Sequence, residues 1–218
     1  MKYSKNHTCY YNSKKDEVPS ATTILKILNK PSLVHWANYL GFKGERVSDV
    51  LEETSKFGTL MHSMVESYVL NKYYIYIPRD DILTSDVYKC LNNFLKWYNT
   101  VKVEPLYTEK SFSSDEFGGT VDFYGKVNGK WTIVDYKTSK QIRLSMFIQL
   151  ALYCILLKYH NLPVEQVGIV LINNKSGGHK FLSIDEMDKY IKVAKLLIKL
   201  FHEYYNLNEE YSWDEEII

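Results

Sequence analysis

Cysteine is scarce in this chain, and its spacing speaks against the usual cysteine-based sites. The three cysteines, Cys9, Cys90 and Cys154, stand far apart and form no C-x-x-C pair. An iron–sulfur cluster or a structural zinc site needs cysteines in close groups, so neither is expected. Isolated cysteines also fit a reducing compartment better than an oxidising one.

Long apolar runs are missing too. No segment approaches the roughly 20 consecutive apolar residues that a membrane-spanning helix needs, so no membrane association is expected. The first residues include lysines but no apolar core of a secretory signal, and Asp16 and Glu17 argue against a transit peptide. The sequence therefore predicts a cytoplasmic protein, a location that also suits a phage-encoded protein inside its host.

No excess of charge of either sign marks the whole chain. Its 27 lysines and arginines balance 26 aspartates and glutamates, which leaves a formal net charge of +1. Any nucleic-acid surface must then be a local patch. Cations do gather in one stretch, at Lys126, Lys130, Lys137, Lys140 and Arg143. The same residues could form the solvated face of a hairpin, so the patch alone does not decide the function.

Length and patterning indicate one domain of the α/β class. The 218 residues, 45% of them apolar, suit a single core, and the chain has no repeats or low-complexity linkers. Apolar residues recur mainly at helical spacing up to about residue 100, and strand patterns begin beyond it. We therefore expect a single domain over residues 1–218, with a helical lobe at about 19–100 and a catalytic core at about 101–218.

Local signals mark the ends of several helices. Ser20 is placed to cap a short helix, and Gly41 is expected to end a second one. An apolar stripe at helical spacing predicts a third helix from about Val47 to Asn71. Ser183 and Glu186 form a capping box for a long final helix.

The most informative stretch is a predicted hairpin that ends at Lys137. Apolar and polar residues alternate on both sides of Asn128-Gly129, the strongest short hairpin signal that a sequence offers. The hairpin would bring Asp122 and Asp135 together on neighbouring strands, and Lys137 would point to the same face as Asp135. Two carboxylates can hold a divalent metal, and an adjacent ammonium can position a water or stabilise charge on a phosphate. This is the layout of a metal-dependent phosphodiesterase.

Two further pairs of polar residues stand on predicted helices. His62 follows Gly58 in the third helix and shares one face with Glu66, one turn further on. Gln149 and Tyr153 share a face of the helix that follows the hairpin in the same way. Either pair alone belongs more often to an ordinary surface or core than to a functional site.

Taken in order, these motifs resemble those of a known family. The series G-x-x-x-H, G-x-x-D, D-x-K-T-S and Q-x-x-x-Y, which runs from Gly58 to Tyr153, resembles the RecB-type branch of the PD-(D/E)XK nucleases. Within that branch the chain is similar to the mitochondrial genome maintenance exonuclease and its phage-encoded relatives, from about Val18 to the last helix. The resemblance implies a restriction-endonuclease-like α/β core, with a mixed central sheet flanked by helices and an N-terminal helical lobe. Relatives that carry an iron–sulfur cluster have extra cysteines that this chain lacks.

The resemblance also implies a metal site and a catalytic lysine. The implied metal ligands are His62, Asp122, Asp135 and the backbone carbonyl of Tyr136. Lys137 would be the catalytic lysine. Carboxylates are hard oxygen donors suited to Mg²⁺, and an imidazole ligand shifts tolerance toward Mn²⁺, so one of these two ions is the expected cofactor.

Five more residues are implied to organise the site or the DNA. Thr138 and Ser139 would lie against the phosphate backbone. Gln149 and Tyr153 would organise the site and the DNA, and Glu66 would be a partner of His62 behind the metal.

The expected activity is that of a metal-dependent deoxyribonuclease. Attack of water on an anionic phosphodiester needs charge neutralisation, a deprotonated nucleophile and a stabilised leaving oxygen, and divalent cations supply all three. The family resemblance favours an exonuclease that works from free, single-stranded DNA ends in replication, recombination or repair. A single-strand or flap endonuclease stays open, as do RNA as substrate, the cleavage polarity and any protein partners.

Two other functions are less well supported by the sequence. A restriction endonuclease would not be expected to carry the His62 and Gln149 motifs, which belong to end-processing nucleases. A catalytically silent DNA-binding module on the same fold usually loses an acidic residue or the lysine, whereas Asp122, Asp135 and Lys137 are all present.

Overall fold

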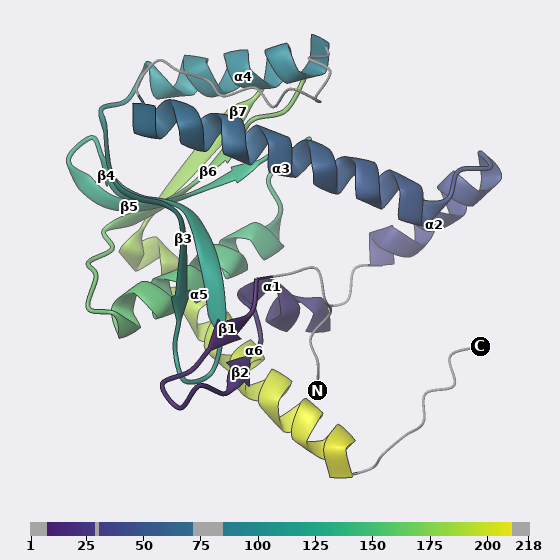
Figure 1. Cartoon of the computed structure of the whole chain (residues 1–218), viewed down its shortest axis with the longest axis vertical. Helices are drawn as coiled ribbons and strands as arrows, with labels where there is room; N and C mark the ends of the chain where they lie inside the picture. The colour runs from purple at the N-terminus through teal and green to yellow at the C-terminus, as the bar shows by residue number, and fades with distance from the viewer. Residues whose placement is uncertain (1–7, 29–30, 72–84, 211–218) are drawn as a thin grey trace.

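The computed structural model describes residues 8–28, 31–71 and 85–210, in which a five-stranded sheet lies between two layers of helices (Figure 1). The strands of this sheet are β3 (Val103–Ser113), β4 (Gly118–Val127), β5 (Lys130–Lys137), β6 (Gln166–Leu171) and β7 (Gly178–Ser183). A small two-stranded ribbon precedes them, made of β1 (Tyr10–Tyr11) and β2 (Glu17–Val18). The helices are α1 (Ala21–Ile24), continued by the 3-10 turn η1 (Leu25–Ile27), α2 (Pro31–Phe42), α3 (Val47–Asn71), α4 (Ser85–Tyr98), α5 (Leu144–Tyr159) and α6 (Ile184–Glu210).

The sheet is mixed and has the strand order β3-β4-β5-β6-β7. β5 and β6 run parallel, and the other neighbouring strands run antiparallel. A parallel pair needs a long crossover connection, which α5 supplies. The expectation of a mixed central sheet flanked by helices is confirmed.

The β4–β5 hairpin forms around the predicted two-residue turn. Asn128 and Gly129 have φ angles of 51° and 82°, both positive as a type I′ turn requires. The pairing then runs from Val127 opposite Lys130 to Phe123 opposite Val134. If this pairing is continued by one residue, Asp122 of β4 stands opposite Asp135 of β5.

Each face of the sheet has its own apolar core. α1, α5 and α6 cover one face, and α3 and α4 cover the other (Figure 1). Ile133 and Val134, consecutive residues of β5, pack into these two different cores. A strand covered on both faces leaves its polar side chains little access to water, so an aspartate there needs a specific partner. In the described part of the chain, none of the helices is both long and apolar enough to cross a membrane.

Three helix signals read from the sequence are found in the structure. α3 has the predicted bounds, Val47–Asn71. The Ser20 hydroxyl accepts the backbone N–H of Thr23 at 3.0 Å and caps α1. At the start of α6, the backbone N–H of Ser183 donates to Glu186 Oε2 at 2.8 Å, and the N–H of Glu186 donates back to Ser183 Oγ at 3.3 Å. The capping box is therefore confirmed.

The predicted end of the second helix was wrong. α2 continues through Gly41 to Phe42, and the left-handed residue beyond it is Gly44, with a φ of +72°. The backbone N–H of Glu45 then donates to the Leu40 carbonyl at 3.0 Å. A helix end of this type needs one residue at positive φ, and the later glycine takes that place.

Candidate active site

The two predicted aspartates and the lysine come together at the centre of the sheet. Asp135 on β5 is 1% exposed, and the Asp122 side chain on β4 is 10% exposed. Asp122 Oδ2 accepts the backbone N–H of Tyr136 at 2.8 Å, which holds the carboxylate against β5. Lys137 Nζ donates to Asp135 Oδ1 at 2.8 Å. The two β5 side chains thus share one face, as their spacing predicted.

His62 reaches the same group from α3. Its Nδ1 lies 3.6 Å from Asp122 Oδ2 and 3.2 Å from Glu109 Oε1. Ligand atoms of His62, Glu109 and Asp122 all lie within 4.8 Å of one another. Asp135, which the sequence predicted to be a metal ligand, is not in that group. Glu109 of β3 is in the group, although no sequence motif marked it.

Glu109 reaches the site because β3 bends there. Its φ is 45°, unusual for a residue other than glycine. Thr108 donates to Glu66 Oε1 of α3 at 3.3 Å, and Glu109 contacts His62 of the same helix. Consecutive strand residues normally point to opposite faces, so the bend turns Glu109 toward α3.

β4 bends opposite the same point. Val121 and Tyr124 both pack in the core beneath α5, although residues three apart on a regular strand face opposite sides. Phe123 lies between them in the other core. The pairing register is the same before and after the bend, so Asp122 stands opposite Glu109. His62, Glu109 and Asp122 therefore meet at the bend of the β3–β4 hairpin, where the side chains of both strands switch faces.

Burial and close charges shift the pKa values of the group. Burial raises the pKa of Asp122 to about 7, with a further contribution from Asp135 that His62 opposes. Burial lowers the pKa of His62, but the carboxylates of Asp122 and Glu109 outweigh it and raise that pKa to about 9. Burial also lowers the pKa of Lys137, and the Asp135 and Asp122 carboxylates more than reverse it, so the ammonium stays charged. Without a cation the group therefore binds protons at neutral pH.

The group fits a divalent cation. Asp135 Oδ2 is buried, and no donor in the described residues meets it in hydrogen-bonding geometry, although Lys137 Nζ is 2.8 Å away. Buried carboxylate oxygens seldom leave a lone pair unused, and a cation would use it. Carboxylates together with one imidazole suit Mg²⁺ or Mn²⁺.

Gln149 and Tyr153 form a pair beside the carboxylates. Gln149 Nε2 donates to the Tyr153 hydroxyl at 2.7 Å. Burial raises the pKa of Tyr153 well above its usual value, and the charges of Asp135 and Asp122 contribute to the shift. The ring packs on the backbone of Gly119, where an added Cβ would be 2.8 Å from Tyr153 Cε1. The glycine of the G-x-x-D motif, Gly119, therefore makes room for the tyrosine of the last motif, Tyr153.

Glu66, Thr138 and Ser139 were also predicted to belong to the site. Glu66 accepts a hydrogen bond from Thr108, and the structure pairs His62 with Glu109 rather than with Glu66. Thr138 and Ser139 follow β5 directly and are half-buried.

The loop after β5 is fixed by two asparagines. Asn173 Nδ2 donates to the Ser139 carbonyl at 2.9 Å, and buried Asn93 of α4 donates to the Asn173 carbonyl at 2.8 Å. These bonds hold Ser139 in place without using its hydroxyl, which donates to the Gln141 carbonyl at 3.2 Å.

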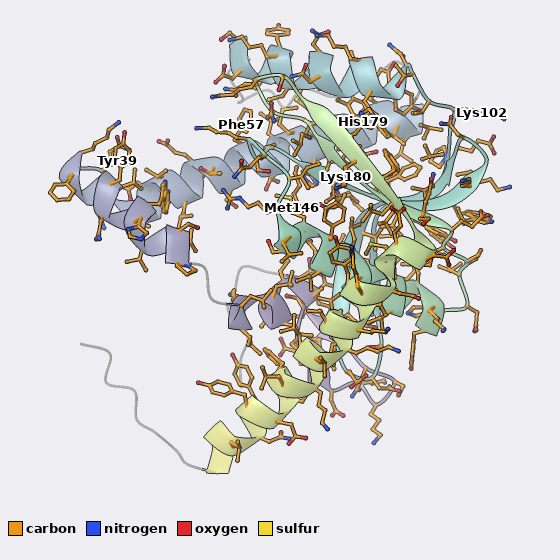
Figure 2. All side chains as sticks on the ribbon, turned by 180° about the vertical axis from the view of Figure 1, so that it is seen from behind. Tyr39, Phe57, Lys102, Met146, His179 and Lys180 are labelled. Carbon is orange, nitrogen blue, oxygen red and sulfur yellow. The ribbon has the colours of Figure 1, made fainter. Side chains whose placement is uncertain are left out.

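A cavity of about 590 Å³ opens next to the lysine. Lys137, Arg143 and Gln149 provide polar groups on its wall, and Leu25 and Leu28 provide apolar surface. The first turn of α5, marked by Met146 in Figure 2, also lines it. A smaller pocket of about 400 Å³ opens on the α3 side of the group, next to His62. The reactive groups can therefore be reached from two sides.

A family model described as the PD-(D/E)XK nuclease superfamily matches residues 32–216, which include every charged residue of the group. No curated protein matches the sequence. The crystal structure of SSO0001 matches with a TM-score of 0.41 and 16% sequence identity, over 89% of this chain and 79% of that one.

Proposed function

Because the chain belongs to the PD-(D/E)XK nuclease superfamily, we propose that it is a divalent-metal-dependent exonuclease that hydrolyses DNA from free, single-stranded ends. Members of this superfamily are generally metal-dependent nucleases. The observation that carries the proposal is the buried group of Asp122, Asp135 and Lys137, with His62 and Glu109 beside it. Replication, recombination or repair is the proposed setting.

Each side chain of the group has a task in this reaction. The proposed ligands of Mg²⁺ or Mn²⁺ are His62, Glu109, Asp122, Asp135 and the backbone carbonyl of Tyr136. When bound, the cation neutralises phosphate charge and lowers the pKa of a bound water. Lys137, held by Asp135, directs a compact positive charge at the reacting phosphate, orients the attacking water and stabilises the charge that develops.

The cavity beside Lys137 is the proposed path of the strand. Its polar wall, with Arg143 and Gln149, suits a phosphodiester backbone, and the leucines Leu25 and Leu28 suit a sugar or an unpaired base. Thr138 and Ser139, at the end of β5, would contact the next phosphates. A duplex would have to unstack before its bases could reach such a surface.

The test compares substrates that differ only in their ends. End-labelled linear single strands, duplexes and closed single-stranded circles are each incubated with Mg²⁺, Mn²⁺ or a chelator. We expect metal-dependent degradation of the linear single strand, slower degradation of the duplex, and no degradation of the circle. Circles cut as fast as linear strands would indicate an endonuclease. Binding without cleavage in any metal would indicate a silent DNA-binding module.

A further inference from the structure

A row of exposed apolar side chains runs along the outer face of α6. We call these residues the α6 stripe: Val193, Leu196, Leu200, Tyr204 and Leu207, which are 40% to 68% exposed. At about 100° per residue they fall within an arc of about 80° of the helix surface. The adjacent arc, with Leu197 and Phe201, is buried against the core beneath α5. A helix that needs only one apolar face to pack therefore carries a second one.

The spacing of the α6 stripe is symmetric about its middle residue, Leu200. Leu196 and Tyr204 are each four residues away from it, and Val193 and Leu207 are each seven away. If two such helices cross antiparallel about a twofold axis at Leu200, Leu196 faces Tyr204 of the second copy and Val193 faces its Leu207. Every position of the stripe then meets an apolar position, and Leu200 meets itself.

Two opposite charges beside the stripe can complement each other across this axis. Lys199 and Glu203 lie on one flank of the stripe, one turn apart. In an antiparallel helix pair, residues of the same flank lie on the same side of the contact. With the axis at Leu200, Lys199 and Glu203 of the second copy are offset by two residues, about 3 Å along the helix axis, a distance that their long side chains can span. Among the described residues, neither side chain is in an ion pair within its own copy.

A groove lies beside the stripe and can receive the second helix. It has a volume of about 380 Å³ between η1 and α6, and Ile27, Leu200 and Tyr204 line it. Because Leu196 of the second copy faces Tyr204 in this register, its side chain would enter the groove. The C-terminal half of α6 also extends past the sheet in Figures 1 and 2, so a second helix could approach it.

We propose that two copies of this chain associate through an antiparallel contact between their α6 helices, with the twofold axis at Leu200. A partner of another sequence would not require a stripe that matches its own reversal, whereas a twofold homodimer does. The stripe spans about 21 Å of helix. One helix pair of this length buries less than the roughly 800 Å² per partner of a standard interface, so the dimer is expected to be reversible.

Sedimentation equilibrium of the full chain over a wide concentration range tests the contact. We expect a monomer–dimer equilibrium that Leu200→Glu abolishes, because it places two carboxylates on the axis. Leu70→Glu is the matched control, since Leu70 is a similarly exposed leucine (57%) on α3. A chain that is monomeric at every concentration would overturn the proposal. So would a dimer that Leu200→Glu leaves intact.

Charge reversal tests the register and does not depend on the Leu200 variant folding. Lys199→Glu should raise the dimer dissociation constant about ten-fold, because two attractive pairs become repulsive. Adding Glu203→Lys to the same chain should restore the constant, since opposite charges meet again across the axis. Thermal unfolding of each variant at low concentration should match the original chain. A double variant as weak as the single one would overturn the antiparallel register.

Discussion

Binding of Mn²⁺ to the site should release about one and a half protons per chain at pH 7. The pKa of Asp122 is raised to about 7 and that of His62 to about 9, so at pH 7 the first is half protonated and the second almost fully. Both groups must lose their protons to bind a cation. Competition by protons therefore weakens as the pH rises, and the apparent dissociation constant should fall by about ten-fold or more between pH 7 and 8. Above pH 9 it should level off.

Calorimetric titration measures the released protons directly. Mn²⁺ binding is recorded at pH 7 in buffers of different ionisation enthalpy, and the slope of the observed enthalpy against that quantity gives the number of protons. His62→Gln should reduce the release to one proton or fewer. His202→Gln is the control, because His202 is on α6, contacts the Glu116 carbonyl at 3.0 Å, and is not among the residues that line the site. A release below about 0.3 protons in the original chain, or an unchanged release in His62→Gln, would refute the assignment.

Three other outcomes are expected. Asp122→Ala and Asp135→Ala should each abolish metal-dependent cleavage of end-labelled strands, and full activity would contradict the assignment. Asp135→Ala should also lower the unfolding temperature, because it leaves the Lys137 ammonium without its carboxylate partner. Lys137→Ala should bind linear single strands in a salt-sensitive way by fluorescence anisotropy while cutting them about 10²–10³-fold more slowly in single-turnover assays. Gly119→Ala should destabilise the fold by about 1–3 kcal/mol in urea unfolding, because its Cβ would lie 2.8 Å from Tyr153 Cε1; an unchanged midpoint would show that the ring moves freely.

The sequence predicted best those features that depend on neighbouring residues. The bounds of α3, the Asn128-Gly129 turn and the capping box of Ser183 and Glu186 follow from local hydrogen bonds and spacing. The Asp135–Lys137 contact follows from strand alternation alone. Each of these signals lies within a few residues, where tertiary packing has little to add.

Glu109 could not be predicted from its neighbours in the sequence. It lies 13 positions before Asp122 in the chain and meets it only because β3 and β4 pair. Strand alternation would also have turned it away from His62, since Thr108 already faces α3. A bend at positive φ in a residue other than glycine leaves no mark in the sequence. The acidic residue nearest in the pattern, Glu66, was therefore singled out as the partner of His62.

The two-residue turn at Asn128 and Gly129 sets the β4–β5 register that brings the two aspartates together. Asp122 and Asp135 are each six positions from it, so their meeting depends on the turn length alone. Inserting or deleting one codon at the turn would shift the register by one residue and turn one aspartate to the opposite face of the sheet. The far end of the β3–β4 hairpin carries no such constraint on this aspartate pair. In an evolving lineage, length changes at the 128–129 turn should therefore abolish activity. Length changes at the 114–117 tip are constrained by a different residue, Glu109, which meets Asp122 only in the present β3–β4 register.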